Sequence, residues 1–279
     1  MNATLAPVAT RRPVASRIVA WFGGAAAAYL PAMALLALLI GAWELIVRVL
    51  DMEAYVLPAP SRIWQAFLQT RDTLPHHTWT TTSEALIGMG FACGVGLALA
   101  AIIASVPLVR RVLYPLLVVS QTIPMVALAP LLIIWFGFGT TPKIIVVALV
   151  GFFPIVVSTV DGLTGADPEI VALVRSMGAS RLQVLRYVRI PAATPAFFAG
   201  VKIAAAYAVL GAVIGEWVGA SSGLGIFITR SQASFRLDRV FVAITVIALV
   251  SLAFFAAAHL LARLASPWMY IRQNEEKSS

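Results

Sequence analysis

Long apolar runs separated by short polar or turn-forming segments dominate the sequence. They cover approximately residues 29–50, 79–104, 113–138, 143–163, 195–219 and 240–264. A helix needs about 20 apolar residues to cross a hydrocarbon core about 30 Å thick, and each run reaches that length. No ten-residue alternation typical of a membrane barrel is present, so helices remain as the way to pair every backbone donor and acceptor in lipid. The pattern predicts an all-α fold, a polytopic membrane bundle of about six transmembrane helices.

Composition agrees with this pattern. Hydrophobic residues make up 61% of the 279 residues and charged residues 11%, which is more apolar surface than one soluble core buries. No fixed-period repeat divides the apolar region, so we expect one transmembrane domain over residues 29–265, with tails at 1–28 and 266–279. The first run continues through about 20 apolar residues without a small-x-small site, so we expect a retained span rather than a cleaved signal. Cys93 is the only cysteine, which excludes an internal disulfide.

The distribution of charge indicates an orientation. The net charge is +8, but no basic stripe with interleaved aromatic residues points to nucleic acid. If the amino end is cytoplasmic, six spans place both termini inside, and the larger share of the 20 Lys and Arg residues also falls inside. The positive-inside rule favours this arrangement. Trp79, Trp135 and Trp217 then lie near outer ends of spans, either as interfacial anchors or as ordinary packing aromatics.

The outer segment at residues 51–78 contains the least regular sequence. Pro58 and Pro60 followed by Ser61 predict an extended stretch and then a short helix, capped by Ser61 and lying on the membrane. His76 and His77 are interpreted as the end of a polar loop. We expect no metal there, because no carboxylate or cysteine stands at ligand spacing.

The connection at residues 164–194 predicts two short helices on the cytoplasmic side. In the first, Asp167 is placed to cap the helix, Pro168 suits the first helical position, and Glu169 complements the positive N-terminal dipole. Gly178 is typical of a residue just past a helix C-terminus. One face is apolar, formed by residues at helical spacing: Ile170, Leu173, Val174 and Met177.

The second helix of this connection starts at Ser180. Gln183 follows three residues later, which is a capping-box pattern, and we expect Pro191 to stop the helix before Pro195 begins the next span. The apolar faces of both helices need a surface to rest on. Periodicity alone leaves open whether that surface is the bundle, lipid or a soluble partner.

The same connection resembles a known motif. Residues 177–181 and 188–193, Met-Gly-Ala-Ser-Arg and Val-Arg-Ile-Pro-Ala-Ala, resemble the "EAA" coupling loop of permeases in bacterial ATP-binding-cassette (ABC) importers. The match falls on Gly178 and Pro191, whereas Ala-Leu-Val at 172–174 stands in place of the Glu-Ala-Ala that names the motif. The resemblance implies a set of residues that couple the chain to an ATPase: Glu169, Arg175, Ser176, Met177, Gly178, Ala179, Ser180, Arg181 and Pro191.

The resemblance extends over nearly the whole chain, through residues 57–61, 121–124, 135–139, 215–219 and 223–225. These stretches are similar to permeases for sulfonates, taurine, nitrate, and pyrimidine-type or riboflavin-type vitamin precursors. Gln-Thr-Ile-Pro at 121–124 and Gly-Glu-Trp at 215–217 favour the vitamin-precursor branch. The resemblance implies a permease subunit in the bacterial inner membrane that imports a small organic solute by alternating access.

Such permeases work with other proteins. The resemblance implies ABC ATPase subunits, an extracytoplasmic solute-binding protein and a second permease copy, with a homodimer favoured over a heterodimer. We expect the chain itself to be no enzyme and to bind no cofactor, with ATP and Mg²⁺ used by the partner ATPase. The sequence contains no Gly-x-x-x-x-Gly-Lys-Ser/Thr loop to cradle phosphates.

Polar residues inside the spans are candidates for a translocation path. Ser120, Gln121 and Pro124 lie in the third span, where Pro124 leaves the Ser120 carbonyl without its helical partner and predicts a kink. The kink is either a polar step in the path or a bend stabilised by neighbouring helices. Glu216, near the outer end of the fifth span, either contacts substrate or lies at the interface.

Other spans carry fewer polar residues. Glu44 is placed to pair with Arg48 four residues on, and Glu84 is expected near the outer end of its span. Alanines and glycines repeat every four residues at 204–212 and 211–219, so we expect the fifth span to be central. Gly90 and Gly94 predict a similar close approach in the second span.

Two other functional classes remain open at this stage. An ion-coupled secondary transporter carries buried acids and bases near mid-membrane, whereas the charges here fall mostly near span ends. A membrane scaffold without transport is compatible with the composition.

Overall fold

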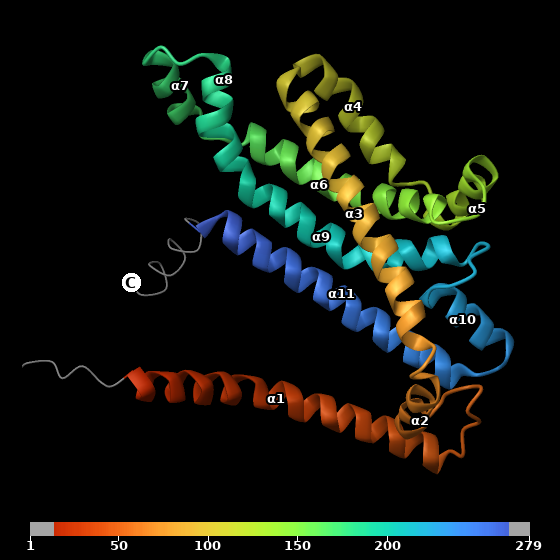
Figure 1. Ribbon diagram of the computed structural model, residues 1–279. Helices are drawn as coiled ribbons and strands as arrows, with labels where there is room; N and C mark the ends of the chain where they lie inside the picture. The colour runs from red at the N-terminus through yellow and green to blue at the C-terminus, as the bar shows by residue number, and fades with distance from the viewer. Residues whose placement is uncertain (1–13, 268–279) are drawn as a thin grey trace, which may run out of the picture.

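Helices account for the regular structure throughout residues 14–267, the part of the chain that the computed structural model describes (Figure 1). Within this described part, five helices are long and apolar enough to cross a membrane, and the consecutive helices α4 and α5 together make a sixth candidate. These results confirm the predicted all-α, polytopic bundle. In chain order the elements are α1 (Val14–Val49), α2 (Pro60–Thr70), α3 (Leu74–Ser105), α4 (Pro107–Ser120), α5 (Met125–Phe136), α6 (Thr141–Thr164), α7 (Pro168–Ser176), α8 (Arg181–Val184), the π-helical turn η1 (Leu185–Arg189), α9 (Ile190–Glu216), α10 (Leu224–Ala233) and α11 (Leu237–Ala265).

The third predicted span is broken. The helices α4 and α5 are inclined by 99°, which confirms the bend predicted beside Gln121. The bend divides residues 113–138 into two helices, so a single continuous span there is wrong. Pro124 has no N–H to continue the α4 ladder and takes the extended conformation that precedes α5. Just before Pro124, the backbone N–H groups of Gln121 and Thr122 donate to carbonyls three residues earlier rather than four. These bonds tighten the end of α4 into a turn.

Helix α9 is the centre of the bundle, as the small-residue spacing predicts. Its alanines 204, 208 and 212 are buried, and it packs against α6, α3 and α11. A Cβ added at Gly215 would lie 2.9 Å from the Cα of Lys143, so α6 and α9 approach closely there.

The close approach of α3 uses other glycines than predicted. In the described part of the chain, no atom apart from the nearby backbone of α3 itself lies within 4 Å of a Cβ built at Gly90 or Gly94. Gly88 and Gly96 face α6 instead, where added Cβ atoms would meet Val147 and Ile155. The predicted pair is therefore wrong, because which glycines of α3 meet α6 depends on the side of α3 on which α6 lies.

Helix α1 contacts the rest of the described chain at its C-terminal end (Figure 1). There Glu44 pairs with Arg48 at 2.5 Å, which confirms that prediction, and the hydroxyl of Ser61 donates to Glu44 at 2.7 Å. The rings of Trp43 and Phe241 lie 5.5 Å apart. Ser61 is therefore not the cap of α2, because Pro60 takes the first helical turn and moves the helix start before Ser61.

The expected limits of the transmembrane domain, residues 29 and 265, differ in how well they match the ends of the helices. Helix α1 begins at Val14, inside the segment expected as a tail at 1–28, and α11 ends at Ala265. Residues 1–13 and 268–279 of the expected tails lie outside the described chain.

Candidate functional site

The first helix of the predicted coupling connection is capped at both ends as its sequence indicates. The Asp167 carboxylate accepts from the Glu169 N–H at 2.8 Å, and Pro168 opens α7. Gly178 has φ of +87°, and its N–H donates to the Arg175 carbonyl at 2.9 Å. Only glycine adopts this left-handed conformation without strain, so Gly178 fixes the direction in which the chain leaves α7.

Most of the apolar face of α7 has no cover within the described residues, although Val174 is partly buried. The exposed fraction is 62% for Leu173 and 79% for Met177, and Ile170 is also exposed. Figure 1 shows α7 and α8 projecting at one end of the bundle, far from α10. The alternative in which this face packs on the bundle as a lid is therefore wrong for this conformation.

The second helix of the connection also begins as predicted. The Ser180 hydroxyl accepts from the Gln183 N–H at 3.3 Å, and the Gln183 side chain accepts from the Ser180 N–H at 2.7 Å, which completes the capping box. The predicted stop at Pro191 is wrong. The chain continues from α8 through η1 into α9, since the wider π turn changes the backbone register just before Pro191.

Most residues expected to couple the chain to an ATPase lie on one projection. We call α7, α8 and the turn between them, residues 167–184, the cytoplasmic knob, after the side of the membrane on which the sequence predicts them. The knob holds Glu169, Arg175, Ser176, Met177, Gly178, Ala179, Ser180 and Arg181, whereas Pro191 lies beyond it in the first turn of α9. Arg175, Ser180 and Arg181 are exposed, so charged and apolar groups are both presented to a partner.

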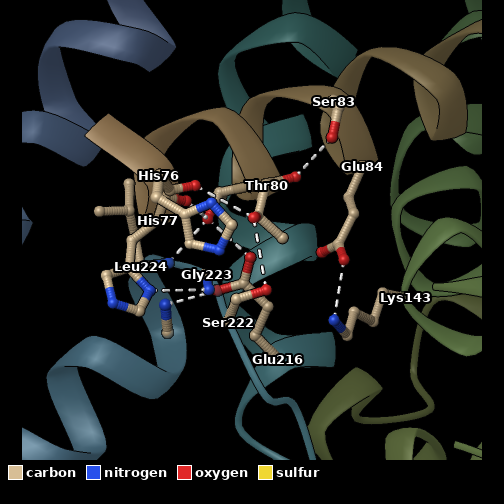
Figure 2. A network of polar contacts seen from close by, with 12 residues as sticks. His76, His77, Thr80, Ser83, Glu84, Lys143, Glu216, Ser222, Gly223 and Leu224 are labelled. Atoms are coloured by element: carbon tan, nitrogen blue, oxygen red, sulfur yellow. Dashed lines mark hydrogen bonds and ion pairs between the residues drawn. The ribbon is translucent and has the colours of Figure 1, made fainter. Parts of the chain in front are cut away.

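Glu216 lies in a buried polar network at the other end of α9 (Figure 2). Its carboxylate accepts from the Thr81 hydroxyl at 2.6 Å and from the Gly225 N–H at 2.5 Å. The same Thr81 oxygen accepts from the Leu224 N–H at 2.8 Å. A carboxylate at the positive N-terminus of α10 is favourable, so Glu216 ties α9 to α3 and α10.

The loop before α10 fits closely over this carboxylate. Gly223 has φ of +124°, and a Cβ added there would overlap the Glu216 carboxylate. Its N–H donates to His77 Nδ1 at 3.0 Å. The interpretation of His76 and His77 as a loop end is wrong, because Pro75 lies in the first turn of a helix that already contains both histidines.

A buried ion pair adjoins Glu216. Lys143 on α6 and Glu84 on α3 are 2.8 Å apart, with exposed side-chain fractions of 8% and 2% (Figure 2). Sequence reasoning did not pair Lys143 with Glu84, and it did not single out Thr81. One feature of the sequence could have predicted this pair. Glu84 and Lys143 carry opposite charges near the predicted outer ends of two spans that are otherwise almost free of charge.

The expected path residues do not form one site. Glu216 is fully buried and its oxygens already accept from Thr81 and Gly225, an arrangement suited to holding the loop before α10 in place. Gln121 is exposed at the break between α4 and α5, and Ser120 bonds back to the Leu117 carbonyl at 2.7 Å. Pro124 forms the extended corner of the same break.

A second tie, at the same end of the bundle as Glu216, joins α2 to the start of α11. Arg236 donates to Asp238 at 2.8 Å and to the side chain of Gln69 at 3.2 Å. Hydrogen bonding to the Asp238 carboxylate raises the pKa of Arg236 above its ordinary value, so this cation stays charged.

Comparison with known proteins covers most of the chain. Residues 92–269 match the family described as "Binding-protein-dependent transport system inner membrane component". The chain is 39% identical over 237 residues to the riboflavin transport system permease protein of Chloroflexus aurantiacus, covering 84% of this chain and 88% of that protein. It is 36% identical over 228 residues to the formylaminopyrimidine transport permease protein of Halalkalibacterium halodurans, covering 81% and 90%.

Solved structures show the same fold. A crystal structure of an amino acid ABC transporter with histidines matches at a TM-score of 0.59 and 18% sequence identity, over 71% of this chain and 97% of that one.

Proposed function

The chain belongs to the family of binding-protein-dependent transport system inner membrane components, and from that membership we propose how it works with its partners. It is a multi-pass permease subunit of an ABC importer. In our proposal ATP and Mg²⁺ are used by separate ATPase subunits, and this chain binds no cofactor. A solute-binding protein delivers the cargo on the outer side of the bacterial inner membrane. Two copies of the chain form a homodimer that alternates between outward-facing and inward-facing states.

The observation that carries the coupling proposal is the exposed apolar face of the cytoplasmic knob. Leu173 and Met177 project from α7 into solvent at a place where the caps of α7 and α8 fix the backbone. A rigid helix with an uncovered apolar face suits insertion into a groove of a partner. We propose that each knob rests in one ATPase subunit, with Glu169, Arg175 and Arg181 at the rim of the contact.

Orientation follows from the same proposal. If the knob is cytoplasmic, the Glu216 network lies on the outer side and both termini are cytoplasmic, in agreement with the distribution of Lys and Arg. The ATPase then acts at one end of α9, and the loop that Glu216 holds lies at the other. Gln121, Ser120 and Pro124, at the break between α4 and α5, remain our candidates for the path.

We propose an uncharged vitamin precursor of the pyrimidine or flavin type as the cargo. The relatives that support this are a riboflavin permease and a formylaminopyrimidine permease, each matched over more than four fifths of the chain. Sulfonates, taurine and nitrate are the alternatives. No observation favours the ion-coupled transporter, because the buried Glu84 and Lys143 already neutralise each other.

The test of the coupling proposal is co-purification with the ATPase. We expect Leu173→Asp with Met177→Asp to abolish ATPase binding without unfolding the permease, because both side chains are exposed and the substitutions introduce charge into an apolar contact. Val56→Asp, also at an exposed apolar residue but in the outer segment, is the matched control. Full ATPase binding by the double variant would refute the docking role of the knob, and absence of any ATPase bound to the wild type would refute the importer.

A further inference from the structure

An open groove lies between α6 and α9, at the level of the break between α4 and α5. Its volume is about 470 Å³, and its lining includes Gln121 from the break, Phe153, Pro154 and Ser158 from α6, and Ile203 and Tyr207 from α9. Ile203 and Tyr207 belong to the middle third of α9, and Phe153 and Pro154 to the middle third of α6. The groove is therefore far from both the cytoplasmic knob and the Glu216 network, and it has the size of a small-molecule site.

Three polar side chains meet in this groove without a partner among residues 30–267. The Gln121 amide, the Ser158 hydroxyl and the Tyr207 hydroxyl form no hydrogen bond there. Ser158 differs in this from its neighbour Thr159, which donates to the Ile155 carbonyl at 2.5 Å. Polar groups at membrane depth cost free energy unless they are hydrogen-bonded, so three on one face indicate water or a polar solute rather than lipid.

A backbone carbonyl adds a fourth polar group to the groove. Pro154 lies inside α6 and has no N–H, so the carbonyl of Val150, four residues earlier, lacks its helical partner. Val150 also lines the groove. A carbonyl left free by an interior proline is tolerated where it faces a polar cavity.

The lining selects for one kind of solute. Phe153 and Tyr207 offer aromatic surfaces for a planar ring, and amide and hydroxyl groups both donate and accept hydrogen bonds. No charged side chain lines the groove, and Lys202, one residue before Ile203, is not part of it. A sulfonate or nitrate ion would lack a counter-charge there, which makes its passage unfavourable.

We propose that this groove is a solute subsite of the permease itself, and that it takes an uncharged, planar heteroaromatic compound with hydrogen-bonding substituents. The inference rests on the proposed importer function and deepens it. Gln121 and Tyr207 determine specificity by pairing with the edge of the ring system. Selectivity in the complex then has two sources, the solute-binding protein and this groove.

The direct test is cysteine accessibility in the permease–ATPase complex. Ser158→Cys in a Cys93→Ala chain gives a single thiol in the groove, since Cys93 is the only native cysteine. We expect a water-soluble maleimide to label this thiol, riboflavin to slow labelling at least threefold, and taurine to leave it unchanged. Absence of labelling would show that lipid or a second copy covers the groove. Equal protection by riboflavin and taurine would show that the groove does not select between them. Either result overturns the proposal.

Uptake into proteoliposomes that contain the ATPase and a saturating solute-binding protein gives the second test. We expect Tyr207→Leu and Gln121→Leu each to lower riboflavin uptake about tenfold, because each removes one hydrogen-bonding partner of the solute. Tyr207→Phe keeps the ring and should retain more uptake than Tyr207→Leu. Tyr55→Leu, at an exposed tyrosine in the outer segment, is the matched control.

These outcomes separate the subsite from the importer function. If ATP-dependent riboflavin uptake survives in both Tyr207→Leu and Gln121→Leu, the subsite proposal is overturned and the importer function stands. The same conclusion follows if the wild type takes up taurine in place of riboflavin. A wild-type chain that never binds an ATPase overturns the proposed function instead. Retained ATPase binding by the two variants shows that any loss of uptake does not come from misfolding.

Discussion

Replacing Lys143 by methionine tests how far the buried ion pair stabilises the outer half of the bundle. The side chain of Lys143 is 8% exposed and lies 2.8 Å from that of Glu84, which is 2% exposed. Methionine keeps most of the unbranched side chain, whose first carbons pack against Gly215, and removes the charge. Glu84 would then have no cationic partner among the described residues, and it lies beside a second carboxylate, that of Glu216.

The expected loss follows from desolvation. Removing one partner of a buried pair leaves an uncompensated charge and costs about 3–5 kcal/mol, whereas replacing both partners by apolar groups of similar volume is often neutral or stabilising. One oxygen of Glu84 is already buried without a hydrogen-bond partner among the described residues, so the site cannot readily compensate. We expect Lys143→Met to lower the free energy of unfolding by about 3–5 kcal/mol, and Glu84→Leu with Lys143→Met to recover most of that loss.

The assay is equilibrium unfolding in mixed detergent micelles, followed by tryptophan fluorescence. Arg48→Met is the matched control, because it breaks the Glu44 pair at a side chain that is 68% exposed, and we expect its unfolding midpoint to equal that of the wild type. The reasoning is refuted if Lys143→Met is as stable as the control, or if adding Glu84→Leu lowers stability further.

Three other substitutions follow from the contacts described above. Gly223→Ala places a Cβ against the Glu216 carboxylate at a positive φ, so we expect loss of uptake with retained ATPase binding, measured in proteoliposomes. Ser180→Ala removes half of the capping box and about 1 kcal/mol of helix stability, so ATPase affinity measured by titration should fall, and an unchanged affinity would count against a rigid knob. Trp43→Ala removes the ring contact with Phe241, and we expect faster proteolysis of the segment between α1 and α2, with the rate in the wild type as reference.

Local chemistry made the cytoplasmic knob predictable. Asp167, Gly178 and the Ser180–Gln183 box act within three or four residues of chain, so their hydrogen bonds can be inferred without knowing the fold. The central position of α9 was predictable for a similar reason, because small residues at four-residue spacing mark a close helix contact whatever the partner.

Long-range contacts explain what the sequence did not reveal. Lys143 and Glu84 are 59 residues apart and pair because α6 lies against α3, while Gly88 rather than Gly90 faces α6 for the same reason. The predicted helix stop at Pro191 was wrong because proline ends a helix when the preceding turns are α-helical. Here a π turn, η1, precedes Pro191, and the chain continues into α9. The groove near Gln121 depends on three helices, and no local pattern predicts it.

The break between α4 and α5 also constrains how the chain is made. At 1.5 Å per residue these helices of 14 and 12 residues are about 21 and 18 Å long, so neither crosses a 30 Å core alone. Released singly into lipid, either one would expose the unpaired backbone at the corner between them. We therefore expect α4 to stay close to α3 until α5 and α6 have been synthesised, so that this region inserts as a unit of four helices rather than span by span.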